Sequence, residues 1–154
     1  MAIPKDSRPD TSRPPAQHLT HSLFVAPKSQ GLHEVTGDIA GWLVDQPMRN
    51  GLLTIFIRHT SASLLIQENV DLDVLWDIEN FLMKLVPEEL SLYRHIAEGP
   101  DDMPAHIKGA LTQTHLVIPV NEGYMMLGTY QGVFVFEHRR QPRKRELVLH
   151  IIGQ

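Results

Sequence analysis

The spacing of apolar residues divides the chain into predicted strands and helices. Residues 52–59 read LLTIFIRH, with apolar side chains on both faces of an extended strand. A strand that is apolar on both faces predicts a covered sheet, and the cover is either helices or a second subunit. Further strands are expected over 18–26, 63–67, 115–119, 123–128, 132–138 and 145–152.

Helices are predicted where apolar residues recur every three or four positions. One helix is expected over 36–44 and another over 71–85, where Pro87 ends the pattern. We interpret the helix over 71–85 as core scaffold with a solvated acidic face. A third helix is expected over 103–112. Consecutive strands with few helices predict one α+β domain of mainly antiparallel sheet.

Composition narrows the class of protein. The 154 residues suit one domain, with 42% hydrophobic and 21% charged residues. Segment 1–17 is rich in proline with little to bury, so we expect a disordered tail before a domain over 18–154. A net charge of −4 argues against general nucleic-acid binding. Without cysteine, a membrane-length apolar run or a secretory signal, we expect a cytoplasmic protein that binds neither nucleic acid nor membrane.

The segment EGPDDMPAHIK, residues 98–108, concentrates reactive side chains at a helix start. Asp101 or Asp102 can cap this helix, and His106 lies one turn after Asp102, within reach of its carboxylate. The N-terminus of a helix also attracts anions. The expected apolar stripe of the helix consists of Met103, Ile107, Ala110 and Leu111. We predict a reaction site here, and the alternative is a well-capped surface helix.

Two further polar clusters follow predicted strands. Strand parity places His59 on an apolar face, where burial can shift its pKa. Hydroxyl donors at Ser61 and Ser63 suit a phosphate group. Arg139 follows the glycines of GTYQG (128–132), which allow close approach of backbone to a ligand. Solvated hairpin charge explains the remaining cations: Arg140, Arg143 and Lys144.

Five runs share one order along the chain: HTSASLLIQEN (59–69), EGPDDMPAHIK (98–108), IP (118–119), LGTYQG (127–132) and EHR (137–139). Together they resemble the YjbQ-like family of secondary thiamine-phosphate synthases. The resemblance covers about residues 18–153 and departs at Tyr130, where the family more often has Trp. It implies an α+β domain of mostly antiparallel sheet, a homotrimer, and a synthase activity that is secondary in the family.

The implied reaction joins a pyrimidine methyl diphosphate to a thiazole phosphate and releases pyrophosphate. Its small phosphorylated substrates need charge neutralisation by a divalent metal (Mg²⁺ or Zn²⁺) or by cationic side chains. Catalytic roles are expected for His59, Glu68, Asp102 and His106. Substrate-binding roles are expected for Ser61, Ser63, Asn69, Lys108, Thr129, Gln131 and Arg139. The candidate metal ligands are His59, His95 and His106, and the carboxylates of Glu68, Asp101 and Asp102 could also hold a metal.

Two other functions fit the same residues. A metal-dependent hydrolase or phosphatase would place His59, His95 and His106 around zinc, although the sequence has no helical HxxxH or HExxH spacing. A non-catalytic trimer would instead bind a small anionic ligand in a solvated cleft. Convergence of the three polar clusters on one pocket distinguishes an enzyme from such a binding protein.

Overall fold

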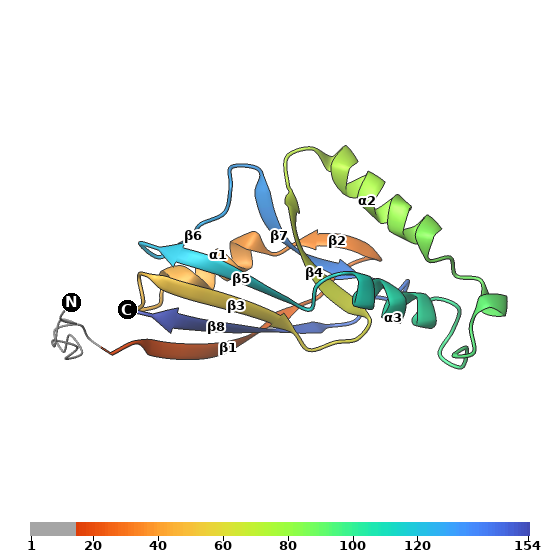
Figure 1. The fold of residues 1–154 in the computed structure, drawn as a ribbon, viewed down its shortest axis with the longest axis horizontal. Helices are drawn as coiled ribbons and strands as arrows, with labels where there is room; N and C mark the ends of the chain where they lie inside the picture. The colour runs from red at the N-terminus through yellow and green to blue at the C-terminus, as the bar shows by residue number, and fades with distance from the viewer. Residues whose placement is uncertain (1–14) are drawn as a thin grey trace, which may run out of the picture.

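The structure, a computed structural model, describes residues 15–154. Residues 1–14 of the predicted tail lie outside the described residues. Within the described range, eight strands and three α-helices form two antiparallel sheets with helices at both ends (Figure 1). This arrangement confirms the predicted α+β class. Across residues 15–154, no helix has the length and apolar character needed to cross a membrane.

The larger sheet has the strand order β1-β8-β3-β5-β6. Its strands are β1 (Gln17–Val25), β8 (Arg145–Gly153), β3 (Gly51–Ile57), β5 (His115–Asn121) and β6 (Tyr124–Met125). Leu53 on β3 pairs with Ile118 on one side and Ile151 on the other, and all three are buried. On the opposite face, Leu52 and Phe56 are 41% and 45% exposed. The second apolar face predicted for this strand is therefore uncovered in the single chain.

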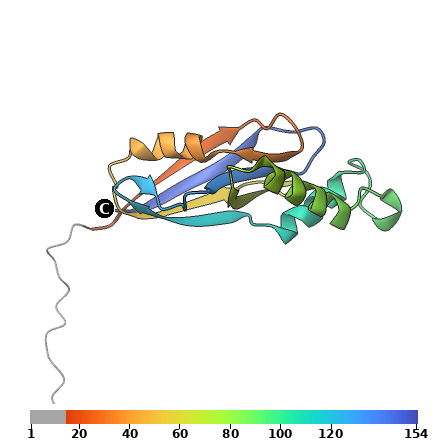
Figure 2. The ribbon, with the colours of Figure 1, turned by 90° about the horizontal axis from the view of Figure 1, so that it is seen from above.

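The smaller sheet has the strand order β2-β7-β4. Its strands are β2 (Gly31–Glu34), β7 (Gln131–Glu137) and β4 (Ala62–Glu68). Leu64 and Val135 of this sheet join Leu53 of the larger sheet in one buried core. The helix α1 (Thr36–Val44) adds Ile39 and Leu43 to that core. Figure 2 shows α1 towards one end of the molecule, and α2 and α3 towards the other.

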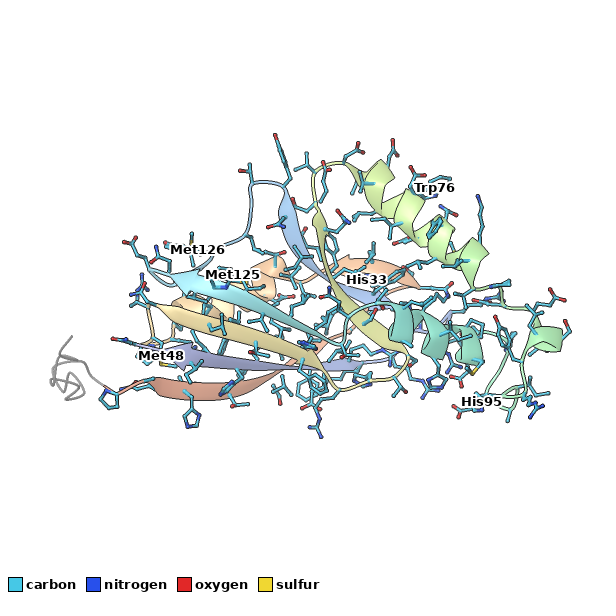
Figure 3. All side chains as sticks on the ribbon, viewed as in Figure 1. His33, Met48, Trp76, His95, Met125 and Met126 are labelled. Carbon is cyan, nitrogen blue, oxygen red and sulfur yellow. The ribbon has the colours of Figure 1, made fainter. Side chains whose placement is uncertain are left out.

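The helix α2 (Leu72–Leu85) contributes no fully buried residue, unlike α1 and α3. Its Trp76 is 63% exposed (Figure 3). An acidic residue of this helix also faces the body of the protein, because Glu79 accepts a hydrogen bond of 2.6 Å from the Leu32 N–H. The interpretation of this helix as core scaffold is therefore wrong for the single chain. Of its predicted solvated acidic face, Asp73 and Asp77 are exposed as expected, and Glu79 is not.

The helix α3 (Asp102–Leu111) buries a different face from the one its apolar residues predict. Asp102, Ala105 and Lys108 are buried, whereas Leu111 is 58% exposed. The predicted stripe is wrong because ion pairing turns Asp102 inward. The sequence also failed to predict β2 and the short 3-10 helix Leu90–Leu92, and the strand expected over 123–128 is limited to the two residues of β6.

Candidate active site

A cavity of about 700 Å³ lies where the end of β3, the start of α3 and the β7–β8 connection meet. Acid–base groups and cations occur together in its wall. The charged and imidazole side chains that line it are Arg58, His59, Glu98, Asp102, His106, Arg139, Arg143, Lys144 and Arg145. Residues from all three polar clusters of the sequence therefore converge on one cavity.

Asp102 connects His106, which lines the cavity, with His95, which does not. Its side chain is almost fully buried, and its Oδ2 lies 2.7 Å from His95 Nε2 and 3.3 Å from His106 Nε2. Its Oδ1 accepts a hydrogen bond from Arg139 Nη1. Burial alone would raise the pKa of Asp102, but the bond from His95 and the charge of Arg139 hold it below its usual value. Asp102 is therefore a carboxylate that orients two imidazoles.

The contact with Asp102 favours one tautomer of His106, because a carboxylate oxygen stabilises an N–H that faces it. A neutral imidazole that donates through Nε2 carries no proton on Nδ1. The basic nitrogen of His106 is therefore Nδ1, and the side chain is 35% exposed in the cavity wall. An imidazole held by a buried carboxylate is the arrangement that many general bases use.

His59 has the opposite tautomer. The backbone N–H of Glu146 donates to His59 Nε2 at 2.9 Å, so the proton of the neutral ring is on Nδ1. Burial lowers the pKa of His59, and the charge of Arg145 acts in the same direction. The ring is therefore neutral at pH 7. The cavity thus contains one imidazole that donates through Nδ1 and one that accepts through Nδ1.

Asp101 and Arg139 connect the start of α3 to the end of β7. Asp101 Oδ2 accepts from Arg139 Nε at 3.1 Å and from the Arg140 N–H at 2.9 Å. Arg139 Nη2 also donates to the Glu98 carbonyl at 2.9 Å. Asp101 is the N-cap residue of α3, yet its side chain makes no capping bond. The predicted side-chain cap is absent because Arg139 and Arg140 occupy the carboxylate.

A buried ion pair holds the β7–β8 connection, which carries the cations. The hairpin predicted here does not form, because β7 pairs with β2 and β4 whereas β8 pairs with β1 and β3 in the other sheet. Arg145 Nε and Nη2 donate to the two carboxylate oxygens of Glu137 at 2.7 and 2.5 Å. The backbone N–H groups of Arg139 and Arg143 donate to the same carboxylate. Arg145 Nη1 donates to Ser61 Oγ at 3.1 Å, which places Ser61 in the cavity wall. Glu137 therefore fixes the backbone from which several cations reach the cavity.

Four predicted site residues lie at one end of β4 and β7 or next to it, away from this cavity. Glu68 pairs in register with Gln131, at the ends of β4 and β7 that are far from Glu137. Asn69 Nδ2 donates to Glu34 Oε1 at 3.0 Å. The cavity lining includes none of the predicted residues Glu68, Asn69, Thr129 and Gln131. A single chain therefore does not bring every predicted site residue together.

Ser63 and Lys108 are buried and do not line the cavity. Ser63 Oγ lies 2.9 Å from His138 Nε2. Lys108 instead lines two smaller cavities together with Gln30. Burial lowers the pKa of Lys108, and the charge of Glu88 opposes that shift. Lys108 therefore lies apart from the cavity that Arg139 lines, although the two residues were expected to bind phosphate together.

Three acid–base side chains could hold a metal ion. One ligand atom from each of His95, Asp102 and His106 lies within 4.8 Å of the others. Figure 3 shows His95 in the segment that precedes α3. A set of two imidazoles and one carboxylate suits zinc. The predicted ligand His59 is not part of this cluster, whereas Asp102 is. A cation there would bind the two imidazoles through unprotonated nitrogen atoms.

Sequence reasoning missed Glu98, Glu137 and Arg145, and it interpreted Arg143 and Lys144 as solvated charge. Both Arg143 and Lys144 are exposed, but they line the cavity. The EHR run contains Glu137 and was the available signal for its importance. The pairing of Glu137 with Arg145 spans eight residues and joins strands of different sheets, so only the fold reveals it.

Comparison with known proteins gives consistent matches over most of the chain. The family model described as "UPF0047 protein YjbQ-like" matches residues 21–154. A UPF0047 protein of Synechocystis sp. is 48% identical over 132 residues, which cover 86% of this chain and 90% of that protein. The UPF0047 protein YjbQ of Escherichia coli O157:H7 is 42% identical over 134 residues, with coverage of 86% and 96%.

Solved structures match the fold. A conserved hypothetical protein of Thermus thermophilus has a TM-score of 0.74 and 32% identity, covering 83% of this chain and 97% of that chain. A YbjQ-like protein of unknown function from Sulfolobus solfataricus has a TM-score of 0.81, with coverage of 90% and 99%. Its identity of 22% supports the fold alone. These matches establish relationship and architecture, and they name no reaction.

Proposed function

We propose that this chain, which belongs to the YjbQ-like UPF0047 family, is an enzyme that acts on a small phosphorylated substrate. The observation that carries the proposal is the convergence of cations and an oriented acid–base pair on one cavity. The exposed cations Arg143 and Lys144 suit phosphate oxygens. An anion-binding protein needs such cations, but it does not need His106 oriented by buried Asp102. The combination therefore favours catalysis.

The specific reaction we propose is that of a thiamine-phosphate synthase. The carbon–oxygen bond of a pyrimidine methyl diphosphate breaks, pyrophosphate leaves with the electron pair, and the nitrogen of a thiazole phosphate bonds to the methyl carbon. Arg143 and Lys144 would neutralise the charge that develops on the leaving group. His59 would donate a hydrogen bond through Nδ1, and His106 would accept one through its own Nδ1. The family resemblance supplies the identity of the substrates.

Calorimetric binding and a pyrophosphate-release assay test the two parts of this proposal separately. Inorganic pyrophosphate should bind the wild type, and the Arg143→Gln/Lys144→Gln variant should bind it at least about tenfold more weakly. The Lys28→Gln/Lys84→Gln variant is the control, because it removes the same charge at exposed positions outside the cavity lining. A wild type that does not bind pyrophosphate contradicts the phosphate site. Binding without pyrophosphate release from the two substrates contradicts the transferase reaction.

A metal-dependent hydrolase is the second candidate, and the cluster of His95, Asp102 and His106 favours it. A divalent cation held there would supply charge neutralisation for hydrolysis of a phosphate ester. The guanidinium of Arg139 pairs with Asp102 and opposes a second positive charge at that carboxylate. Zinc titration of the wild type and of His95→Gln separates the candidates. Stoichiometric zinc that switches on ester hydrolysis supports the hydrolase, and pyrophosphate release in the presence of a chelator supports the transferase.

We also propose that the chain forms a homotrimer, as the family resemblance implies. The outer face of the larger sheet exposes Leu52 and Phe56, and α2 exposes Trp76 and Phe81. Large apolar surfaces of this kind commonly mark protein interfaces. The sheet face and the helix are different surfaces, so contact between them on successive copies would be head-to-tail. Head-to-tail contacts close into a ring when the rotation permits.

A further inference from the structure

We infer that the substrate carries a compact uncharged body next to its phosphate, and that Ala62, Gly109 and Ala110 form the pocket for that body. This inference rests on the proposed function and adds a specificity pocket to the same site. A second cavity, of about 270 Å³, adjoins the cation-lined cavity. The residues common to the two linings are His59, Thr60, His106 and Thr114.

The chemistry of the second cavity differs from that of the first. The residues that line only the second cavity are Ala62, Gly109 and Ala110, and none has a polar side chain. A phosphate group placed there would lose water without gaining a cation. An uncharged ring or short aliphatic group would lose only unfavourable contact with water. A volume of about 270 Å³ is slightly below the range of pockets for drug-sized ligands, so one ring-sized group suits it.

The size of this pocket is set by the absence of side chains. At Gly109, an added Cβ would approach the Thr60 carbonyl oxygen to 3.2 Å, so α3 and the segment before β4 are closely packed there. Ala62 is buried, so its methyl group forms a fixed part of the pocket wall. Ala110 is exposed on α3 and forms part of the lining. A longer side chain at position 110 can therefore occupy the pocket without entering the protein core.

The shared residues determine where the reacting bond lies. His59 and His106 line both cavities, one as a donor through Nδ1 and the other as an acceptor through Nδ1. A substrate with its phosphate among the cations and its body against Ala110 would span both cavities. The bond that joins the body to the phosphate would then lie between the two imidazoles. Acid–base groups would be useful at that position.

Binding of two probes tests this inference: phenyl phosphate, which has a body, and inorganic phosphate, which has none. Ala110→Leu should weaken phenyl phosphate binding by about tenfold or more and leave inorganic phosphate within about twofold, as measured by calorimetry. Both residues are strong helix formers, so α3 should be retained. Ala40→Leu is the matched control, because Ala40 is an exposed alanine on α1 outside both cavities. It should change neither affinity.

Two further measurements keep the inference testable if Ala110→Leu fails to fold. Ala110→Met should show the same selective loss, and wild-type protein should bind phenyl phosphate at least about tenfold more tightly than inorganic phosphate. Equal weakening of both probes, or no weakening of either, would overturn the apolar pocket while leaving the phosphate site in place. Wild-type protein that binds neither probe would overturn the proposed function itself.

Discussion

His106 Nε2 lies 3.3 Å from Asp102 Oδ2, one turn later on α3. The same oxygen lies 2.7 Å from His95 Nε2, so one carboxylate orients two imidazoles. Because Asp102 is 2% exposed and also pairs with Arg139, the fold fixes its position. This relationship links the start of α3 to the chemistry of the cavity, since it leaves Nδ1 of His106 free to accept a proton.

Stability should fall as the pH drops below the usual pKa of histidine, because folded His138 resists protonation. Burial lowers the pKa of His138 from 6.5 to about 3, and the charges of Lys108 and Arg145 act in the same direction. Between these values the unfolded chain binds a proton that the folded chain excludes. The free energy of unfolding should therefore fall by up to about 1.4 kcal/mol per pH unit. Urea unfolding between about pH 6.5 and pH 5 measures this slope.

The His138→Gln variant isolates this effect, because glutamine can still hydrogen-bond to Ser63 but does not titrate. Its stability should depend less steeply on pH than that of the wild type. His115→Gln, at an exposed position on β5, should keep the wild-type slope. Equal slopes in the wild type and His138→Gln would show that His138 does not control acid stability.

Removing one member of the Glu137–Arg145 pair should destabilise the protein strongly. Both side chains are buried, so Glu137→Leu leaves the guanidinium without its partner at a cost of about 3–5 kcal/mol. The Glu137→Leu/Arg145→Leu double variant should be more stable than the Glu137→Leu single variant. Urea unfolding of the wild type, Glu137→Leu, Arg145→Leu and the double variant gives the coupling energy directly. Additive losses in the double variant would mean that the two side chains act independently.

The assembly can be tested on α2. Size-exclusion chromatography with light scattering should give the mass of three chains for the wild type. Trp76→Glu should reduce that mass, because it places a charge on the apolar surface of α2, where Trp76 is 63% exposed in the single chain. Asp77→Asn changes the adjacent exposed residue and should leave the assembly intact. A monomeric wild type at micromolar concentration would contradict the trimer.

The sequence predicted the type and position of most elements because local spacing determines them. The helix expected over 36–44 matches α1, and the helix expected over 71–85 matches α2 to within one residue. The buried face of α3 could not be predicted in this way. Asp102 is buried because Arg139, 37 residues away in sequence, pairs with it. Spacing within the helix contains no information about that partner.

The candidate site was predictable only where its residues lie close to an element boundary. His59 follows β3, and Asp102 and His106 belong to α3, so the meeting of these two elements brings the three side chains together. Glu68 and Gln131 belong to equally prominent runs, yet the β4–β7 register places them far from the cavity. Strand register is set by pairing across the sheet, and a sequence run alone does not specify it.

The rate of pyrophosphate release by Asp102→Asn tests the central claim most directly. Asparagine retains the shape of the side chain but removes the charge that orients His106 and pairs with Arg139. Loss of the Asp102–Arg139 ion pair should lower the stability of the variant, so the assay is run well below its melting temperature. The kcat should fall by about 100-fold or more, while Asp77→Asn on α2 should keep the wild-type rate. A wild-type rate in folded Asp102→Asn would contradict the account and reduce the segment 98–108 to a structural helix start.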